Sequence, residues 1–176
     1  MNEQLPVEQI IIHRSEPLQY FFATRAMEMV PASDDYVLEP ASEGLRVRAA
    51  NECALELPAE ILRETYGDAL AFLPIGVATQ RHRGSTYEPV MFVRTEVGAD
   101  AQPAVREALR ARAGTILEEE THRTLVVTRA LAPQKSLLGF PAELHKAAGI
   151  EARLWIWLSH YAPVEAEAEQ RRPSNR

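Results

Sequence analysis

The order of hydrophobic periods in the second half of the sequence constrains the fold more than any other feature. An alternating strand pattern that stops at Gly98 is followed by apolar residues at helical spacing that end near Gly114. Two more strand patterns, a second helical stretch closed by Gly149 and a last strand come next. The predicted elements are a strand at 87–97, a helix that begins at 101 and is ended by Gly114, strands at 115–120 and 124–131, a helix at 137–148 and a strand at 151–158.

This β-α-β-β-α-β order is that of the ferredoxin-like, split βαβ arrangement. Two helices should therefore cover one face of a four-stranded antiparallel sheet. The short link at 121–123 predicts a hairpin between the two middle strands. Pro141 predicts either an irregular first turn in the second helix or the point at which that helix begins.

The first half of the sequence has weaker patterns. They predict strands at 9–13, 20–30, 44–50 and 71–79, and a helix at 58–70. Residues 80–85 are interpreted as a link between the two halves. We therefore predict an α+β protein with a smaller α+β N-terminal domain at 1–85, a ferredoxin-like domain at 86–164 and a disordered tail at 165–176, where bulky apolar residues are almost missing.

Composition excludes several classes of protein. No apolar run approaches the 18 residues or so of a membrane-spanning helix, so no membrane association is expected. The first residues lack the basic and apolar regions of a secretion signal, and a lone cysteine, Cys53, fits a reducing compartment, so we expect a cytoplasmic protein. No Cys/His spacing indicates a metal site, and neither a metal nor another cofactor is expected.

Net charge gives no direct sign of nucleic-acid binding. The chain carries −6 at pH 7, and residues 1–85 hold 13 acidic against 7 basic side chains. Residues 86–163 are balanced, so any basic surface must come from the arrangement of individual arginines.

Four motifs occur in the order and at the spacing seen in one family of translation factors. They are Tyr-Glu-Pro-Val-Met at 87–91, Leu-Arg-Ala-Arg-Ala-Gly-Thr-Ile at 109–116, Leu-Gly-Phe-Pro-Ala-Glu-Leu at 138–144 and Ser-His-Tyr-Ala-Pro-Val at 159–164. On these motifs the chain resembles domain V of elongation factor G and of the tetracycline-resistance ribosomal protection proteins. Residues 23–50 and 57–62 resemble, more loosely, the first strands and the helix entry of domain IV, which would be shortened here.

The resemblance implies a ribosome-binding module whose partner is large-subunit rRNA near the sarcin–ricin loop and the stalk base. The chain has no Gly-x-x-x-x-Gly-Lys-Ser/Thr loop to hold nucleotide phosphates, so we expect no GTP hydrolysis by this chain and no enzymatic activity. It is either part of a longer factor or a stand-alone relative. An Arg-Arg-Pro stretch at 171–173 resembles the end of the ribosomal protection proteins and leaves antibiotic protection as a further alternative.

Arginines are the candidate RNA contacts because a guanidinium group binds phosphate in a bidentate manner. The family resemblance favours the end of the first helix and the adjoining turn. The candidates are Arg106, Arg110 and Arg112 on that helix, Arg123 in the hairpin and Arg81 and Arg83 in the link. For each of them, an ordinary solvated position is the alternative.

The last strand carries a second candidate surface. Its alternation places Leu154 and Ile156 on the face toward the helices and Arg153, Trp155 and Trp157 on the opposite, open face. On ferredoxin-like sheets this is the face on which RNA-recognition modules stack bases. The preferred alternative is that the first half of the chain covers the tryptophans, because exposing two of them is unfavourable.

A different class of function also fits the open face. It could serve a regulatory or oligomerisation protein that never contacts RNA, with the face binding a small ligand or forming a homodimer.

Overall fold

The structure, a computed structural model, describes residues 5–149 and 151–164 and divides into two compact units, with the division after Gly76. This is earlier than the predicted boundary at 85/86. Strand β6 (Gln80–His82), predicted to be a link, pairs with the start of β7 (Ser85–Gly98) and so belongs to the second sheet. The predicted disordered tail at 165–176 lies outside the described residues.

The second unit has the predicted order of elements. After β7 come α3 (Gln102–Ala111), β8 (Thr115–His122), β9 (Leu125–Pro133), α4 (Gln134–Leu137), α5 (Phe140–Ala148) and β10 (Arg153–Pro163). The strands form an antiparallel sheet in the order β10-β7-β9-β8, with β6 added alongside β7. This is the split βαβ, ferredoxin-like arrangement, and it confirms the predicted fold class.

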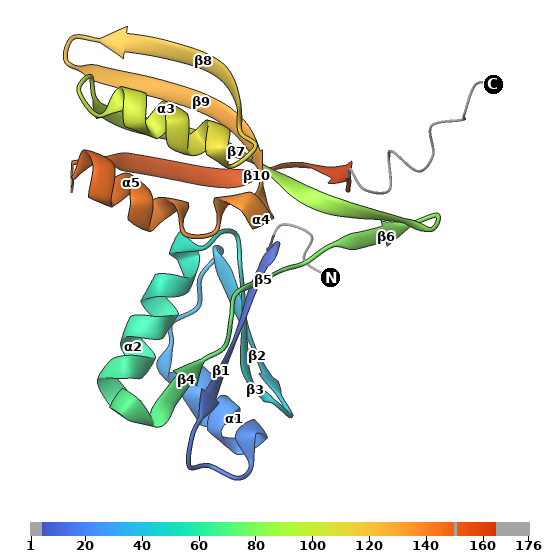
Figure 1. Cartoon of the computed structure of the whole chain (residues 1–176). Coiled ribbons are helices and arrows are strands. Elements are labelled where there is room, and N and C mark those ends of the chain that lie inside the picture. The colour runs from blue at the N-terminus through green and yellow to red at the C-terminus, as the bar shows by residue number, and fades with distance from the viewer. Residues whose placement is uncertain (1–4, 150, 165–176) are drawn as a thin grey trace. The chain divides into compact units, whose positions relative to one another are not determined.

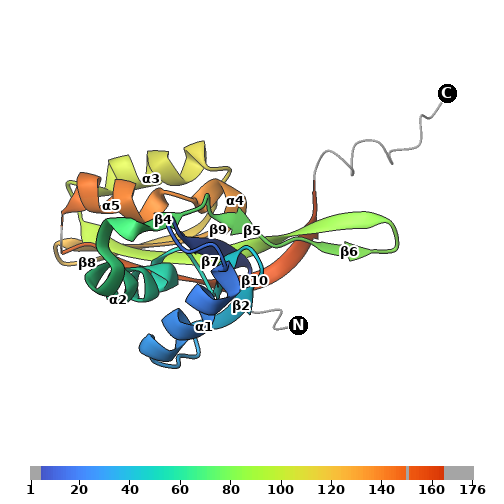
Figure 2. The same ribbon diagram turned by 90° about the horizontal axis from the view of Figure 1, so that it is seen from below.

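The helices of this unit lie on one side of its sheet, as Figure 2 shows. The core between them contains Met91 and Val93 of β7, Leu109 of α3 and Phe140 and Leu144 of α5, all almost fully buried. The sheet side chains in this core occupy alternate strand positions, which leaves the intervening positions on a face that no helix of the same unit covers.

Two local details differ from the prediction. The second helical stretch is split, because Gly139 takes a left-handed conformation (φ 81°) between α4 and α5. The β8–β9 hairpin turns at Arg123 and Thr124 only, since His122 already pairs with Leu125, and Arg123 has φ of 57°. Hairpin turns of two residues commonly use such left-handed positions.

The first unit has the same topology as the second. It contains β1 (Val7–His13), α1 (Gln19–Met29), β2 (Tyr36–Ala41), β3 (Gly44–Ala49), η1 (Cys53–Leu55), α2 (Glu56–Tyr66), η2 (Gly67–Ala69) and β4 (Leu70–Phe72), and the two-residue strand β5 (Gly76–Val77) spans the division. The sheet order is β2-β3-β1-β4, with β5 also on β1 (Figure 1). Both α1 and α2 contribute to one core with β1 and β3, so this unit is also a split βαβ fold.

The predicted strand at 20–30 is wrong, because these residues form most of α1. Phe22, Ala23 and Ala26 are fully buried at helical spacing, whereas Tyr20 and Phe21 are more than half exposed. The aromatic run at its start favours a strand by composition, and burial of one helical face overrides that preference. The loose resemblance of 23–50 to the first strands of a domain IV has no structural basis at this helix.

Candidate nucleic-acid interface

The open face of the second sheet gathers aromatic and charged side chains from its three neighbouring strands. Register pairs place Leu131, Phe92 and Trp157 in one row across β9, β7 and β10, and Arg129, Arg94 and Trp155 in the next row. Directly paired residues share one side of a sheet, so each row forms a continuous strip. The predicted residues Arg153, Trp155 and Trp157 do lie together on this face.

Both tryptophans are exposed, and each has an aromatic or cationic neighbour. Trp157 is 46% exposed and stacks on Phe92, with ring centroids 4.7 Å apart and an interplanar angle of 24°. Trp155 is 38% exposed and lies beside the Arg94 guanidinium, whose carbon is 4.6 Å from the ring centroid. These contacts hold the indole rings in position. A ligand that stacks on them would therefore cost less side-chain entropy than one that stacks on freely rotating rings.

The charges on the open face are balanced by ion pairs. Arg129 contacts Glu118 at 2.6 Å and Glu120 at 3.2 Å, and Glu96 pairs with Arg94 and, at 3.8 Å, with Arg153. A hydrogen bond with His122 and the Arg129 pair lower the pKa of Glu120, which keeps that carboxylate ionised. Because these arginines are neutralised, the exposed indole rings are the distinctive feature of the face.

The predicted RNA-contact arginines of α3 and its C-cap residue Arg112 fall into two groups. Arg106 forms a two-bond ion pair with Glu119, with its Nη2 2.7 Å from the carboxylate, and this pair raises the pKa of the guanidinium. Arg112 pairs with Glu143 at 2.6 Å and lies over the Phe140 ring. Arg110 is exposed and forms no ion pair within the described residues. Only Arg110 of the three therefore presents an uncompensated charge.

The remaining predicted arginines lie at turns. Arg123 occupies the β8–β9 turn, and Arg81 and Arg83 lie in the β6–β7 hairpin, which Figure 1 shows extending beyond the helices of the unit. All three are exposed and form no ion pair with any residue the structure describes. The structure thus does not bring the six arginines into one patch.

One of these arginines continues the open face. Arg81 pairs with Thr86, which is in phase with Phe92 and Arg94 along β7, so strand alternation places Arg81 on the side of the tryptophans. Arg110 belongs to α3, on the covered side of the sheet. Any RNA contacting both groups would have to pass an edge of this unit.

Phe92, Arg94, Arg129 and Leu131 of the open face are not among the candidates predicted from the sequence. The signal was present, because Phe92 and Arg94 alternate with the apolar Met91 and Val93 in the predicted strand at 87–97. Arg129 could be placed only once the β7–β9 register was known.

Ser159 and His160 contradict a simple alternation argument, which expects neighbouring side chains to point to opposite faces. The register shifts between Leu158 and His160, and this irregularity brings Ser159 Oγ within 3.1 Å of His160 Nδ1.

The described residues contain no group of three or more His, Cys, Asp and Glu side chains arranged to hold a metal ion. None of the helices in the described part combines the length and apolar character needed to cross a bilayer.

Comparison with known proteins agrees with the fold of both units. The family model described as "Elongation factor G C-terminus" matches residues 85–172, half of the chain. A crystal structure of a protein from Thermus thermophilus aligns over 94% of this chain with a TM-score of 0.66 and 15% sequence identity. The alignment covers 42% of that structure, so the chain spans less than half of its length. No curated protein matches the chain.

Proposed function

Because the chain belongs to the elongation factor G C-terminus family, we propose that it is a non-catalytic, translation-factor-like module that binds the ribosome through large-subunit rRNA. The observation that carries the proposal is a set of four exposed arginines without ion pairs in the described structure. They are Arg81, Arg83, Arg110 and Arg123. In an acidic chain, arginines left without carboxylate partners fit an external anionic surface.

Phosphate contacts supply the affinity in this proposal. An arginine that forms no internal ion pair can bind a phosphate without breaking an existing contact. It therefore contributes more to the affinity than an arginine that must first separate from its glutamate. Arg106 and Arg112, which are already paired with glutamates, therefore support the fold of the unit, and the four unpaired arginines contact RNA.

The open face supplies a second kind of contact. Trp155 and Trp157 are two residues apart on one strand face, which separates them by about 7 Å, and each already has a partner that fixes its ring. An unpaired base stacking on such a ring is worth about 1–3 kcal/mol. The face therefore binds unstacked nucleotides of an rRNA loop, and the module acts in the cytoplasm, where ribosomes are.

The proposal is tested by sedimentation of the chain with large ribosomal subunits over a range of salt concentrations. We expect the chain in the ribosomal pellet at low salt and its release as salt rises, because displaced counterions drive such binding. Arg110→Ala should lower the slope of log affinity against log salt by about one unit. Arg25→Ala, which removes the same charge from the first unit, is the matched control. Failure of the unchanged chain to pellet at low salt would sink the proposal.

A homodimer through the open face is the second candidate function. The observation that favours it is the combination of two exposed tryptophans with balanced arginine and glutamate pairs, a surface that can be complementary to itself. Analytical ultracentrifugation distinguishes the two candidates. A concentration-dependent dimer that Trp157→Ser abolishes, together with no ribosome binding, would favour the dimer.

A further inference from the structure

A cavity of about 670 Å³ that is open to solvent lies in the first unit, and the predicted RNA contacts are not among its lining residues. It is lined by Arg14, Arg63, Gly67, Asp68, Leu70 and Phe72. Arg14 directly follows β1, Arg63 is in the last turn of α2, and the other four residues belong to η2 and β4. The volume is in the range of sites that bind small molecules, about 300–1,000 Å³.

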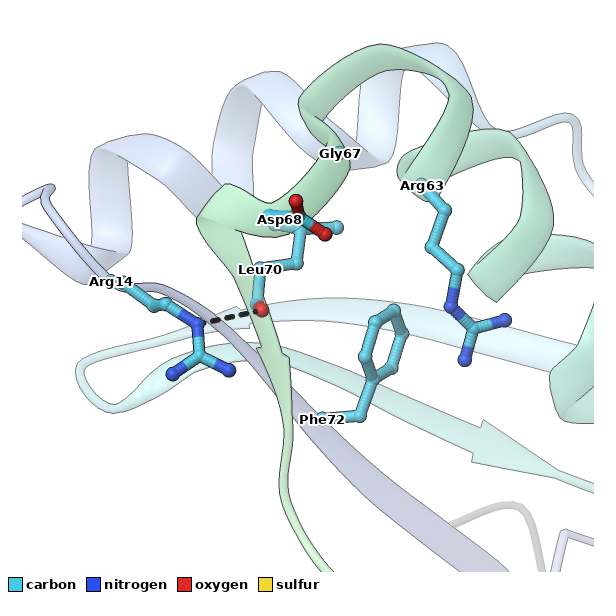
Figure 3. Close-up of a pocket in the computed structure, with 6 residues that line it drawn as sticks. All are labelled: Arg14, Arg63, Gly67, Asp68, Leu70 and Phe72. Carbon is cyan, nitrogen blue, oxygen red and sulfur yellow. Dashed lines mark hydrogen bonds between the residues drawn. The ribbon is translucent and has the colours of Figure 1, made fainter.

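The two arginines lie on either side of Phe72, as Figure 3 shows. Arg14 donates its Nε hydrogen to the carbonyl of Leu70 at 3.1 Å, and its backbone N–H donates to Ala69 at 2.7 Å. The Arg63 guanidinium carbon is 4.3 Å from the centroid of the Phe72 ring. Each guanidinium is thus held by a neutral group, which fixes its position and leaves its charge uncompensated.

The rest of the unit makes this arrangement unusual. Residues 1–76 contain five basic and thirteen acidic side chains, so carboxylates are abundant. The other arginines of the unit, Arg25, Arg46 and Arg48, are each ion-paired with a glutamate. Arg14 and Arg63 form no ion pair within the described residues, and both line the same cavity. Asp68 is the one acidic residue of the lining, and it is exposed.

From these observations we infer that the cavity between Arg14 and Arg63 is a binding site for the phosphate group of a nucleotide, free or within RNA. A guanidinium presents parallel N–H donors that match two phosphate oxygens, and two such groups bind a dianion better than one. Leu70 and Phe72 provide an apolar wall for the organic part of the ligand, and the Asp68 carboxylate accepts a hydrogen bond from a sugar hydroxyl.

This site does not depend on ribosome binding, so the test uses the full-length chain without ribosomes. Inorganic pyrophosphate, adenosine monophosphate and a six-nucleotide uridine RNA are titrated separately, with amide chemical shifts recorded by NMR. We expect saturable shifts at Asp68, Leu70 and Phe72 that weaken as salt increases. Tighter binding of adenosine monophosphate than of the RNA identifies a free nucleotide, and the reverse order identifies an RNA backbone.

Variants separate this site from a general charge effect. Arg63→Ala should weaken binding at least tenfold, and Arg25→Ala, which removes the same charge elsewhere in the unit, should leave it unchanged. Arg14→Ala also removes the hydrogen bond to Leu70, so Arg14→Lys is included as a variant that keeps the charge. Asp68→Asn should tighten pyrophosphate binding, because it removes a like charge from the cavity. The inference is overturned if no probe shifts these residues at millimolar concentration, or if Arg25→Ala weakens binding as much as Arg63→Ala.

Discussion

The guanidinium carbon of Arg94 lies 4.6 Å from the centroid of the Trp155 ring, and the two residues are register partners across the β7–β10 ladder. A cation over an aromatic ring at a partly exposed site contributes about 0.5–1 kcal/mol. A double-mutant cycle with Arg94→Ala and Trp155→Ala, measured by urea unfolding, should therefore give a coupling energy of that size. The same cycle with Arg110→Ala should give a value near zero, since Arg110 lies on α3. Equal coupling in both cycles would contradict the contact.

Arg110 and Arg112 are two residues apart, and they should differ in their effect on stability. Arg112 is paired with Glu143 and covers the Phe140 ring, so Arg112→Ala should lower the free energy of unfolding by about 1 kcal/mol through lost packing and lost charge pairing. Arg110 is exposed and unpaired in the described structure, and Arg110→Ala should stay within about 0.5 kcal/mol of the unchanged chain. Urea unfolding followed by tryptophan fluorescence measures both values. A larger loss for Arg110→Ala would reverse the assignment of roles.

The second unit could be predicted from sequence because its local signals agree with its tertiary packing. Buried and less buried residues alternate along most of the strand at 87–97. The helix that contains Val105 and Leu109 ends shortly before Gly114. A Cβ on Gly114 would lie 2.6 Å from the Leu109 carbonyl oxygen, so the residue type itself marks the end of the helix. The open-face residues of β10 followed from the same alternation.

The first unit was harder to predict because its signals conflict. Residues 20–22 form an aromatic run typical of a strand, and only the burial of Phe22, Ala23 and Ala26 against the sheet makes this segment a helix. Strand β2 was missed because Pro40 lies within it. The Arg14–Arg63 cavity could not be predicted either, since Arg14 meets the other lining residues, all within 63–72, only when β4 pairs with β1.

Position 44, the first residue of β3, requires glycine for two reasons. A side chain has no room there, and the backbone conformation is one that favours glycine. Its φ is 147°, and a Cβ at this position would lie 2.5 Å from the carbonyl oxygen of Ile11. Gly44→Ala should therefore lower the free energy of unfolding by about 2 kcal/mol or more, because the neighbour is a backbone atom within a sheet.

Gly84 provides the matched control for Gly44. Its φ is 79°, but no atom lies within 4 Å of a Cβ built on it. Gly84→Ala should therefore lower the free energy of unfolding only by the cost of placing a Cβ at positive φ, about 1 kcal/mol. Urea midpoints of the two variants give the comparison. Equal losses would mean that the contact with Ile11 relaxes without consequence.

Cys53 should react slowly although it is not fully buried. Burial, together with the smaller effect of the Glu56 and Glu52 carboxylates, raises the pKa of its thiol to about 11. At pH 8 such a thiol is about 0.1% thiolate, compared with about a quarter for an unperturbed thiol. Iodoacetamide should therefore alkylate the folded chain about 200-fold more slowly than the chain unfolded in urea.

The pH dependence of this reaction identifies its cause. Because the folded pKa is raised, the alkylation rate should increase about tenfold per pH unit until the pH approaches the folded value of about 11. The stability gained from the protonated thiol is present below the unfolded pKa, near 8.5, and is lost as the pH rises toward the folded one. Glu56→Gln removes one like charge, so it should lower the pKa and speed alkylation at pH 8. A slow rate that does not change with pH would show that access to Cys53, and not its ionisation, limits the reaction.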